Sequence, residues 1–206
     1  MMISYFCNMK KQVEAGIPTN WGFFNMVAYS EEGTEPMPHL ALVHPEMDPN
    51  QPVYVRIHSE CLTGDLFGSH RCDCGEQLDK AMQMVAQKKG MVLYLRQEGR
   101  GIGLINKLKA YNLQDKGLNT ADANVHLGLE VDARQYGIAV EMLQDLGIRS
   151  IHLITNNPLK IEAIEESDIT VSSRVPIVIE PKAENEAYLK TKEELMGHLL
   201  KNQNGK

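Results

Sequence analysis

Residues 76–107 read EQLDKAMQMVAQKKGMVLYLRQEGRGIGLINK, and the hydrophobic period changes twice within this stretch. Up to residue 89 the apolar side chains recur at the spacing of one helix face; they are Leu78, Ala81, Met82 and Val85. The next apolar run, MVLYL at 91–95, is typical of a buried strand. Glycines follow this run, and a second helix is expected over 104–116. The stretch therefore predicts a helix, a strand, a glycine-rich loop and a helix in succession.

The flanking segments extend this pattern in both directions. Runs rich in β-branched and aromatic residues predict strands over 23–29, 39–44 and 53–57. Later we expect a loop over 119–128, a helix over 133–146, a strand over 151–154, a short helix opened by Asn156-Asn157-Pro158, a strand over 169–179 and an amphipathic helix over 184–200. Strands followed by alternating helices and strands predict an α/β or α+β fold with one mixed sheet flanked by helices. No repeat or linker interrupts the chain, so a single domain is expected over 1–206, with its core at 21–200.

Composition and charge limit the classes of protein to which this chain can belong. Of its 206 residues 43% are hydrophobic and 23% charged, which excludes a mainly disordered chain. No apolar run approaches the roughly 20 residues that cross a bilayer, and residues 1–11 lack the pattern of a signal peptide. The net charge of −6 disfavours a protein that coats nucleic acid, although residues 91–116 carry five basic and only two acidic side chains. We therefore expect a cytoplasmic protein with no membrane or nucleic-acid partner, and a basic middle segment that suits a small anion.

Three of the four cysteines lie close together in the sequence. Cys61, Cys72 and Cys74 have the spacing C-x10-C-x-C, whereas Cys7 stands alone near the N-terminus. Three thiolates around zinc leave one position for water, which is the arrangement of a catalytic zinc site. The alternative is three buried reduced thiols without a metal, because free cysteine is often a core residue. A nearby histidine, His58 or His70, is a further candidate ligand.

The glycine-rich segment RQEGRGIGLINK, residues 96–107, has features of an anion site. Glycines let backbone N–H groups approach a phosphate, and a following helix N-terminus adds a favourable dipole. Arg96 and Arg100 strengthen this interpretation, because a guanidinium group binds phosphate with two hydrogen bonds. The segment matches neither the G-x-G-x-x-G pattern nor a P-loop, so an ordinary turn stays open as the alternative.

Two other short segments carry weaker signals. Asp132 and Arg134 flank Ala133 at the expected start of a helix, where an acid is common without any ligand. Residues 155–160 (TNNPLK) join an expected strand to an expected helix, and ligands often bind at such strand ends in α/β sheets. An Asn-Pro turn needs no ligand, so spacing alone decides neither case.

Five strings occur in one order along the chain: HSECLTGD (58–65), RCDCGEQL (71–78), RQEGRGIGL (96–104), NNPLK (156–160) and MGHLL (196–200). Together they resemble the GTP cyclohydrolase II family of riboflavin biosynthesis, over residues 21–200. The resemblance implies hydrolysis of GTP to formate, pyrophosphate and 2,5-diamino-6-ribosylamino-4(3H)-pyrimidinone 5′-phosphate. It also implies one zinc ion held by three cysteines and water, magnesium with the triphosphate, and a homodimer. Bifunctional members carry a second domain ahead of this one, for which 206 residues are expected to leave no room.

The resemblance further implies a role for each matched residue. The zinc ligands fall on Cys61, Cys72 and Cys74. The GTP-binding residues fall on Arg56, Ile57, His58, Ser59, Glu60, Gln77, Glu98, Gly99, Arg100, Thr120, Thr155 and Lys160. The catalytic residues are a tyrosine near the substrate, a proton acceptor and a nucleophile, at Tyr111, Asp132 and Arg134. In the family's proposed mechanism the arginine attacks the α-phosphorus, forming a transient phosphoramidate, and the neighbouring acid activates it.

Two other functions fit parts of the sequence. The string His58-Ser59-Glu60 has the H-x-E form of zinc deaminases, but those enzymes need a following P-C-x-x-C, and this chain has C-D-C instead. A zinc module that binds nucleotide without catalysis is the other alternative, and the net charge speaks against its binding nucleic acid.

Overall fold

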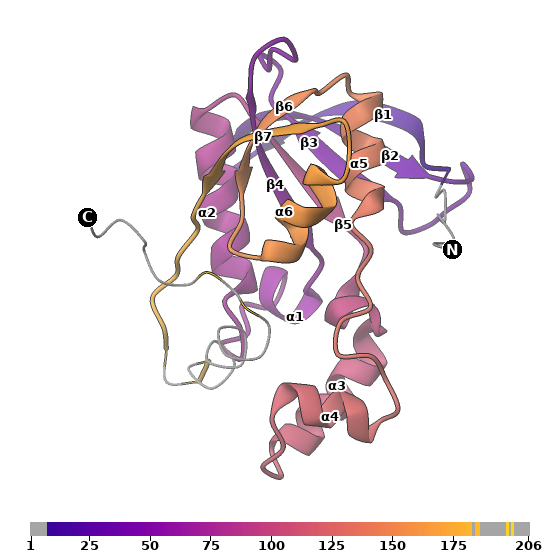
Figure 1. Ribbon diagram of the computed structural model, residues 1–206, viewed down its shortest axis with the longest axis vertical. Coiled ribbons are helices and arrows are strands. Elements are labelled where there is room, and N and C mark those ends of the chain that lie inside the picture. Colours follow the sequence, from indigo (N-terminus) through magenta and orange to yellow (C-terminus); the bar gives the residue numbers. More distant parts are fainter. Residues whose placement is uncertain (1–7, 183, 186–196, 198, 200–206) are drawn as a thin grey trace.

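A computed structural model describes residues 8–182, 184, 185, 197 and 199, which form a seven-stranded mixed sheet with helices on both faces (Figure 1). The strands are β1 (Lys10–Thr19), β2 (Gly22–Ser30), β3 (His39–Val43), β4 (Val53–Ser59), β5 (Met91–Leu95), β6 (Ser150–Ile154) and β7 (Thr170–Val175). The helices are α1 (Leu62–Asp65), α2 (Cys74–Gln87), α3 (Gly103–Gln114), α4 (Thr120–His126), α5 (Gly137–Asp145) and α6 (Pro158–Glu165), with a 3₁₀ turn at Glu98–Gly101. The predicted α/β fold with a mixed sheet is confirmed.

The order of the strands divides the sheet into two halves. Across the sheet the order is β1-β2-β3-β5-β4-β6-β7. The first three strands are antiparallel to their neighbours, whereas β5, β4, β6 and β7 run parallel. The carboxyl ends of the parallel strands therefore meet at one edge of the sheet, which is where α/β proteins bind ligands.

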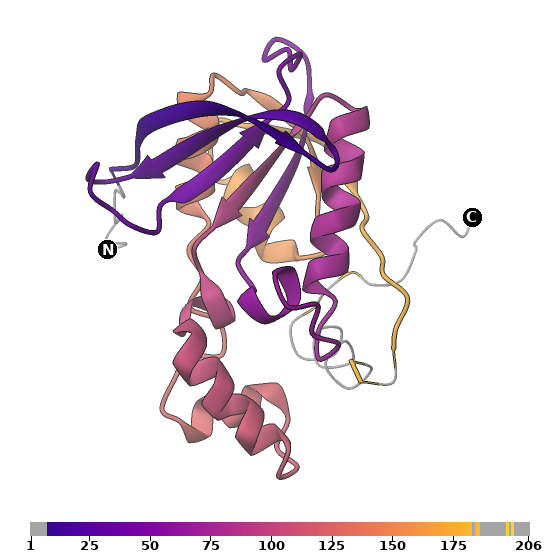
Figure 2. The same cartoon turned by 180° about the vertical axis from the view of Figure 1, so that it is seen from behind.

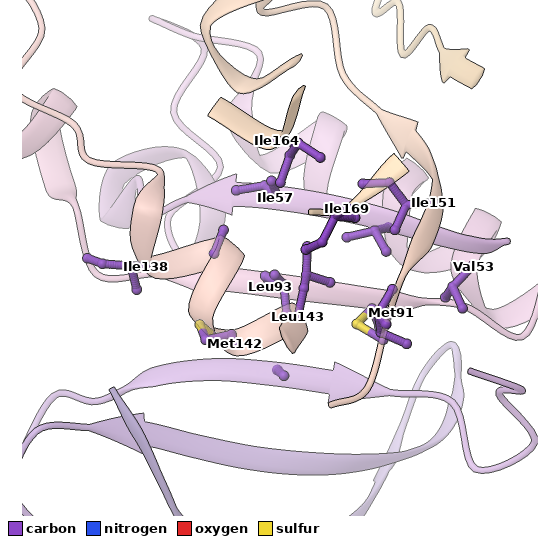
Figure 3. Close-up of a cluster of buried hydrophobic side chains, with 14 of the residues drawn as sticks. Val53, Ile57, Met91, Leu93, Ile138, Met142, Leu143, Ile151, Ile164 and Ile169 are labelled. Carbon is purple, nitrogen blue, oxygen red and sulfur yellow. The ribbon is translucent and has the colours of Figure 1, made fainter. Parts of the chain in front are cut away.

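Two hydrophobic clusters attach the helices to opposite faces of the sheet (Figures 1 and 2). On one face α5 and α6 pack onto the central strands, and Figure 3 shows the fully buried side chains of Leu143, Leu93 and Ile151 within this cluster. On the other face α2 buries Met82 and Val85 against the sheet. Burial of one apolar stripe explains why the spacing in 76–89 predicted a helix correctly.

Lys89 and Gly90, which follow the C-terminal end of α2, differ in backbone conformation. Lys89, and not Gly90, has the left-handed backbone with φ +53°. Gly90 is required for a different reason, because a Cβ atom there would lie 2.2 Å from the backbone oxygen of Tyr54. The close approach of these two backbones brings β5 into register beside β4.

One predicted element was wrong, and a second begins later than expected. Residues 119–128 contain a helix, α4, which Asn119 caps by accepting a hydrogen bond from the Asp122 N–H at 2.9 Å. The helix expected over 133–146 begins only at Gly137, because the preceding residues are held against the glycine-rich loop. Strand β1 was not predicted, and the terminal helix expected over 184–200 lies outside the described residues, apart from isolated positions. Within the described part of the chain, every helix is too short or too polar to cross a membrane.

Helices α3 and α4 form a lobe that projects from the edge of the sheet (Figure 1). The chain leaves the sheet through residues 96–102 and returns through 127–136. At this crossing the N–H of Ala133 donates to the carbonyl oxygen of Arg100 at 3.0 Å. A Cβ atom on Gly101 would lie 3.0 Å from the Ala133 carbonyl, so the outgoing and returning backbones touch. We call this contact the neck of the lobe.

Candidate active site and metal centre

Three neighbouring parallel strands deliver the predicted site residues to one pocket. Cys61 follows β4, the glycine-rich loop follows β5, and Thr155 follows β6. The pocket between the sheet edge and the lobe has an empty volume of about 1010 Å³, open solvent included. The predicted residues that line it are Arg56, His58, Ser59, Glu60, Cys61, Cys72, Cys74, Gln77, Glu98, Gly99, Arg100, Tyr111, Thr120, Arg134, Thr155 and Lys160. Motifs that are far apart in the sequence thus converge on a single cavity.

Two predicted residues do not line this pocket. Ile57 is fully buried in the hydrophobic core, and its backbone oxygen accepts a hydrogen bond from Lys160 Nζ at 2.8 Å. Asp132 lies behind Arg134, to which it is paired. Each of these residues thus contacts a neighbour that does line the pocket.

The three cysteines form a compact thiol cluster that lines the pocket. Their sulfur atoms all lie within 4.8 Å of one another, and the Cys61 and Cys72 sulfurs are 3.6 Å apart. Three sulfurs about 2.3 Å from a tetrahedral zinc ion would be roughly 3.8 Å apart. The cluster could therefore hold a metal ion, and its spacing and soft sulfur donors fit zinc.

Glycines allow the thiols to come together. A Cβ atom on Gly64 would lie 3.0 Å from the Cys72 sulfur and 3.2 Å from that of Cys61. A Cβ atom on Gly75 would lie 2.3 Å from the carbonyl oxygen of Gly64. Helix α1, which follows Cys61, and the start of α2 can approach only because both positions lack a side chain.

The electrostatics of the cluster favour ionised sulfur at Cys61. Hydrogen bonds with the Cys72 and Cys74 thiols and the charge of Lys107 hold the pKa of the Cys61 thiol well below its usual range. The hydrogen bond with Cys61 and burial raise the pKa of Cys72 to about 11.

Lys107 and Glu98 form a buried ion pair beside this cluster. Lys107 Nζ lies 2.8 Å from Glu98 Oε1 and 3.1 Å from the Cys61 sulfur. Burial alone would lower the pKa of Lys107, but the charge of Cys61 and the hydrogen bond to Glu98 outweigh it and raise the pKa. Lys107 was counted in the basic middle segment and was not predicted as a site residue.

Asp65 organises the histidine next to the cluster. Its carboxylate accepts hydrogen bonds from His58 Nε2 at 3.1 Å, from the Tyr94 hydroxyl at 2.9 Å and from the backbone N–H of Cys61 at 3.0 Å. His58 is therefore bound to Asp65, and the described group of candidate metal ligands consists of three cysteines. This arrangement does not support His58 as a zinc ligand or the deaminase interpretation.

Two buried cationic side chains, Arg56 and Lys160, also line the pocket. Arg56 donates to the Gln77 side-chain oxygen at 2.7 Å and to the Ile154 carbonyl at 3.1 Å. Among the described residues its buried Nε atom has no hydrogen-bond partner. Lys160 is buried on the same side of the pocket, with its ammonium group 5.4 Å from the centre of the Tyr136 ring. Such cations suit a polyanionic ligand.

Asp132 and Arg134 meet although they are only two residues apart. Asp132 Oδ1 accepts hydrogen bonds from Arg134 Nε at 2.8 Å and from its backbone N–H at 3.2 Å, and Oδ2 accepts one from the guanidinium Nη2. Burial would raise the pKa of Asp132, but the hydrogen bond and charge of Arg134 outweigh it and lower the pKa. These residues lie in a loop before α5 and not at the start of a helix as expected, so helix geometry does not separate their side chains.

The lobe contributes Tyr111, Thr120 and Asn124 to the pocket. Burial raises the pKa of Tyr111 to about 12, so its hydroxyl keeps its proton at neutral pH. The Arg71 guanidinium lies over the Tyr111 ring, 4.9 Å from its centre. Asn124 was missed because it falls in the unpredicted helix α4.

Sequence comparisons agree with the architecture of this site. The family model for GTP cyclohydrolase II matches residues 10–176. The chain is 50% identical over 193 residues to the riboflavin biosynthesis protein RibBA of Chlorobium phaeovibrioides, covering 93% of this chain and 47% of that protein. It is 49% identical over 205 residues to RibBA of Bacillus subtilis, covering 97% of this chain and 51% of that protein. The chain thus spans about half the length of the curated relatives that it matches, and it belongs to the GTP cyclohydrolase II family.

Proposed function

We propose that this chain is a zinc-dependent GTP cyclohydrolase II. It would hydrolyse GTP to formate, pyrophosphate and 2,5-diamino-6-ribosylamino-4(3H)-pyrimidinone 5′-phosphate, the first step of riboflavin biosynthesis. The observation that carries the proposal is the buried cluster of Cys61, Cys72 and Cys74 in the same pocket as the residues matched to nucleotide binding. The names of the RibBA relatives and the family match support it.

Cys61, Cys72 and Cys74 would hold the zinc ion, because their sulfurs all lie within 4.8 Å of one another and the Cys61–Cys72 separation of 3.6 Å is close to that of a tetrahedral site. Zinc held by these residues would supply a nucleophilic water for the attack on C8 of the guanine ring at neutral pH. The second hydrolysis would release that carbon as formate. Lys107 contacts Cys61 and is itself paired with Glu98, so the protein also supplies a partner for one of the ligands.

The cationic side of the pocket would bind the triphosphate. Arg56 and Lys160 are buried there, and Arg100 and Arg134 line the same cavity. Magnesium bound to the phosphates would offset their remaining charge, which is its usual role with nucleoside triphosphates. The side chains of His58, Ser59, Glu60, Gln77, Glu98, Thr120 and Thr155, with the backbone of Gly99, would position the rest of the nucleotide.

Asp132 and Arg134 would release the pyrophosphate. A nitrogen of Arg134 would attack the α-phosphorus, forming a nitrogen–phosphorus bond while the bond to the leaving pyrophosphate breaks. The proton lost by the guanidinium has an acceptor in place, because Asp132 receives Arg134 hydrogen bonds on both carboxylate oxygens. Water would then cleave the phosphoramidate to give the 5′-phosphate. Tyr111, protonated at neutral pH, would donate a hydrogen bond to the substrate.

The remaining expectations stay part of this proposal. We expect a homodimer in the cytoplasm, and a single domain over residues 1–206 with its core at 21–200. The non-catalytic zinc module stays the alternative, since it would need the same thiol cluster and the same cations.

Incubation of the purified chain with GTP, zinc and magnesium tests the proposal. Formate and pyrophosphate are measured separately, and both should appear in equal amounts. Cys72→Ser should abolish formate release and reduce the zinc content, whereas Cys7→Ser, which changes the remaining cysteine, should do neither. Folded, zinc-loaded protein that binds GTP but releases no formate would be the non-catalytic module, and release of ammonia would instead indicate a deaminase.

A further inference from the structure

A lysine is buried against one of the three thiols. Lys107 is 8% exposed, and its ammonium group lies 3.1 Å from the Cys61 sulfur and 2.8 Å from Glu98 Oε1. Burying an ammonium group is costly unless charged or polar partners replace its water. Both partners of Lys107 are groups that accept hydrogen bonds and can carry negative charge. The buried ammonium group of Lys107 is therefore held in place partly by the thiol cluster.

The second partner, Glu98, is fixed by the backbone on both sides of the cluster. Glu98 Oε2 accepts the N–H of Leu62, the residue after Cys61, at 2.6 Å. Its Oε1 accepts the N–H of Gly99 at 2.7 Å and the ammonium of Lys107 at 2.8 Å. The carboxylate thus joins residues 61–65, which we call the metal loop, to the glycine-rich loop. These contacts leave Lys107 little freedom to move. The sequence resemblance had matched Glu98 to nucleotide binding, whereas these contacts face the metal loop.

The placement of Lys107 also has an electrostatic consequence. Three thiolates and one divalent cation leave a net negative charge on the centre. An ammonium group in contact with one sulfur offsets that charge and reduces the electron density which this sulfur donates. Hydrogen bonds to metal ligands tune a centre in this way, and their removal commonly costs 10- to 100-fold, an order-of-magnitude range, in metal affinity or activity.

We infer that Lys107 is a positioning residue of the metal centre, which holds the Cys61 thiolate through a charge-assisted hydrogen bond while Glu98 fixes the lysine. The inference rests on the proposed function only in taking the three cysteines to be metal ligands. Lys107 acts through Cys61 and need not touch the substrate.

Cobalt(II) substitution tests this inference without GTP. Cobalt bound to thiolates absorbs in the near ultraviolet, and a hydrogen bond to sulfur moves this charge-transfer band to shorter wavelength. Lys107→Met should move the band to longer wavelength and weaken zinc binding about 10-fold or more, measured by competition with a chelator. Lys107→Arg retains a charged donor and should keep the zinc affinity within about threefold of the unchanged protein.

Lys109→Met is the matched control, because Lys109 is exposed on the same helix. It should change neither the band nor the affinity. A Lys107→Met protein with an unmoved band and unchanged zinc affinity would overturn the inference, even if its thermal stability fell. If Lys107→Met does not fold, the cobalt bands of Lys107→Gln and Lys107→Arg are compared instead. A band that is shifted in Lys107→Gln but not in Lys107→Arg supports the inference, and identical bands in the two variants overturn it.

The outcome separates this inference from the proposed function. A moved cobalt band in a protein that releases no formate from GTP would leave the role of Lys107 intact and refute the activity. Formate release by the unchanged protein together with an unmoved band in Lys107→Met would support the activity and overturn the role of Lys107.

Discussion

The carboxylate of Asp65 lies 3.1 Å from His58 Nε2, and the two side chains are only 6% and 3% exposed. A carboxylate accepts hydrogen bonds, so His58 carries its proton on Nε2 and its Nδ1 is an acceptor. Burial lowers the pKa of His58 although Asp65 opposes the shift, which favours the neutral ring. The same carboxylate receives the backbone N–H of Cys61, so the histidine and the metal loop share one anchor.

We therefore predict that Asp65→Asn destabilises the protein and its metal site together. The variant has one acceptor oxygen in place of two for three buried donors, and leaving such groups unpaired costs about 2–4 kcal/mol of unfolding free energy. Urea denaturation and zinc content measure the two effects. Asp48→Asn, which alters an exposed turn, is the control and should leave both unchanged. Full zinc occupancy and full stability in Asp65→Asn would contradict this role.

The lowered pKa values of His58 and His39 indicate how the free energy of unfolding should depend on pH. Burial lowers the pKa of His58, and burial with the charge of Arg96 lowers that of His39. The unfolded chain, with a histidine pKa of about 6.5, then binds more protons than the folded one below that pH. Stability should therefore fall as the pH drops below about 6.5, by up to about 1.4 kcal/mol per pH unit for each histidine.

His39→Asn isolates one of these contributions. The slope of unfolding free energy against pH is measured by urea denaturation between pH 7 and about 5.5. It should be smaller than in the unchanged protein by an amount that corresponds to at most one bound proton. Contributions from the cysteines and from His58 are common to both proteins and cancel in the comparison. An identical slope in the variant would show that His39 does not resist protonation in the folded state.

Arg134→Ala should block pyrophosphate release in a protein that still binds zinc. The loss should be at least about 100-fold, since a group that acts on the transferred phosphoryl is removed. Arg134→Lys restores the charge without the paired hydrogen bonds to Asp132 and should recover little activity. Arg149→Ala, at an exposed arginine, is the control. Normal pyrophosphate release by Arg134→Ala would exclude the covalent role of the arginine.

Gly90→Ala should destabilise the sheet without touching the pocket. Its Cβ atom would lie 2.2 Å from the Tyr54 carbonyl oxygen, and relieving such an overlap costs about 1–3 kcal/mol. Gly137→Ala is the matched control, because a Cβ atom there meets nothing within 4 Å and lies at the start of α5. Thermal unfolding should show a lower midpoint for Gly90→Ala and an equal or higher one for Gly137→Ala.

Periodicity predicted the elements whose burial is set by one face. Helix α2 and strand β5 follow their predicted limits closely because Met82, Val85 and Leu93 are buried in the hydrophobic clusters. Strand β1 gave no comparable signal, because most of its side chains are exposed and its pairing with β2 holds it in place. Helix α4 is short and buries a small and a polar residue, Ala123 and Asn124, so it has no apolar stripe.

The candidate site was predictable where its residues follow one another in motifs. The thiol spacing and the glycine-rich loop identified the two walls of the pocket, and strand order explains why they meet. The partners of these residues were not predictable. Lys107 and Asp65 have ordinary positions in the sequence, and their roles arise from contacts with Cys61 and His58 that only the folded chain creates.

The neck of the lobe has a consequence for how charge is arranged in the pocket. The hydrogen bond from Ala133 to Arg100 connects the backbone that carries one arginine to the residue just before another, Arg134. The backbone positions from which two positively charged side chains extend into the pocket, although remote in the sequence, are thus linked directly to each other. A substitution at Gly101, where a Cβ atom would lie 3.0 Å from the Ala133 carbonyl, would strain this link while leaving both arginines in the sequence.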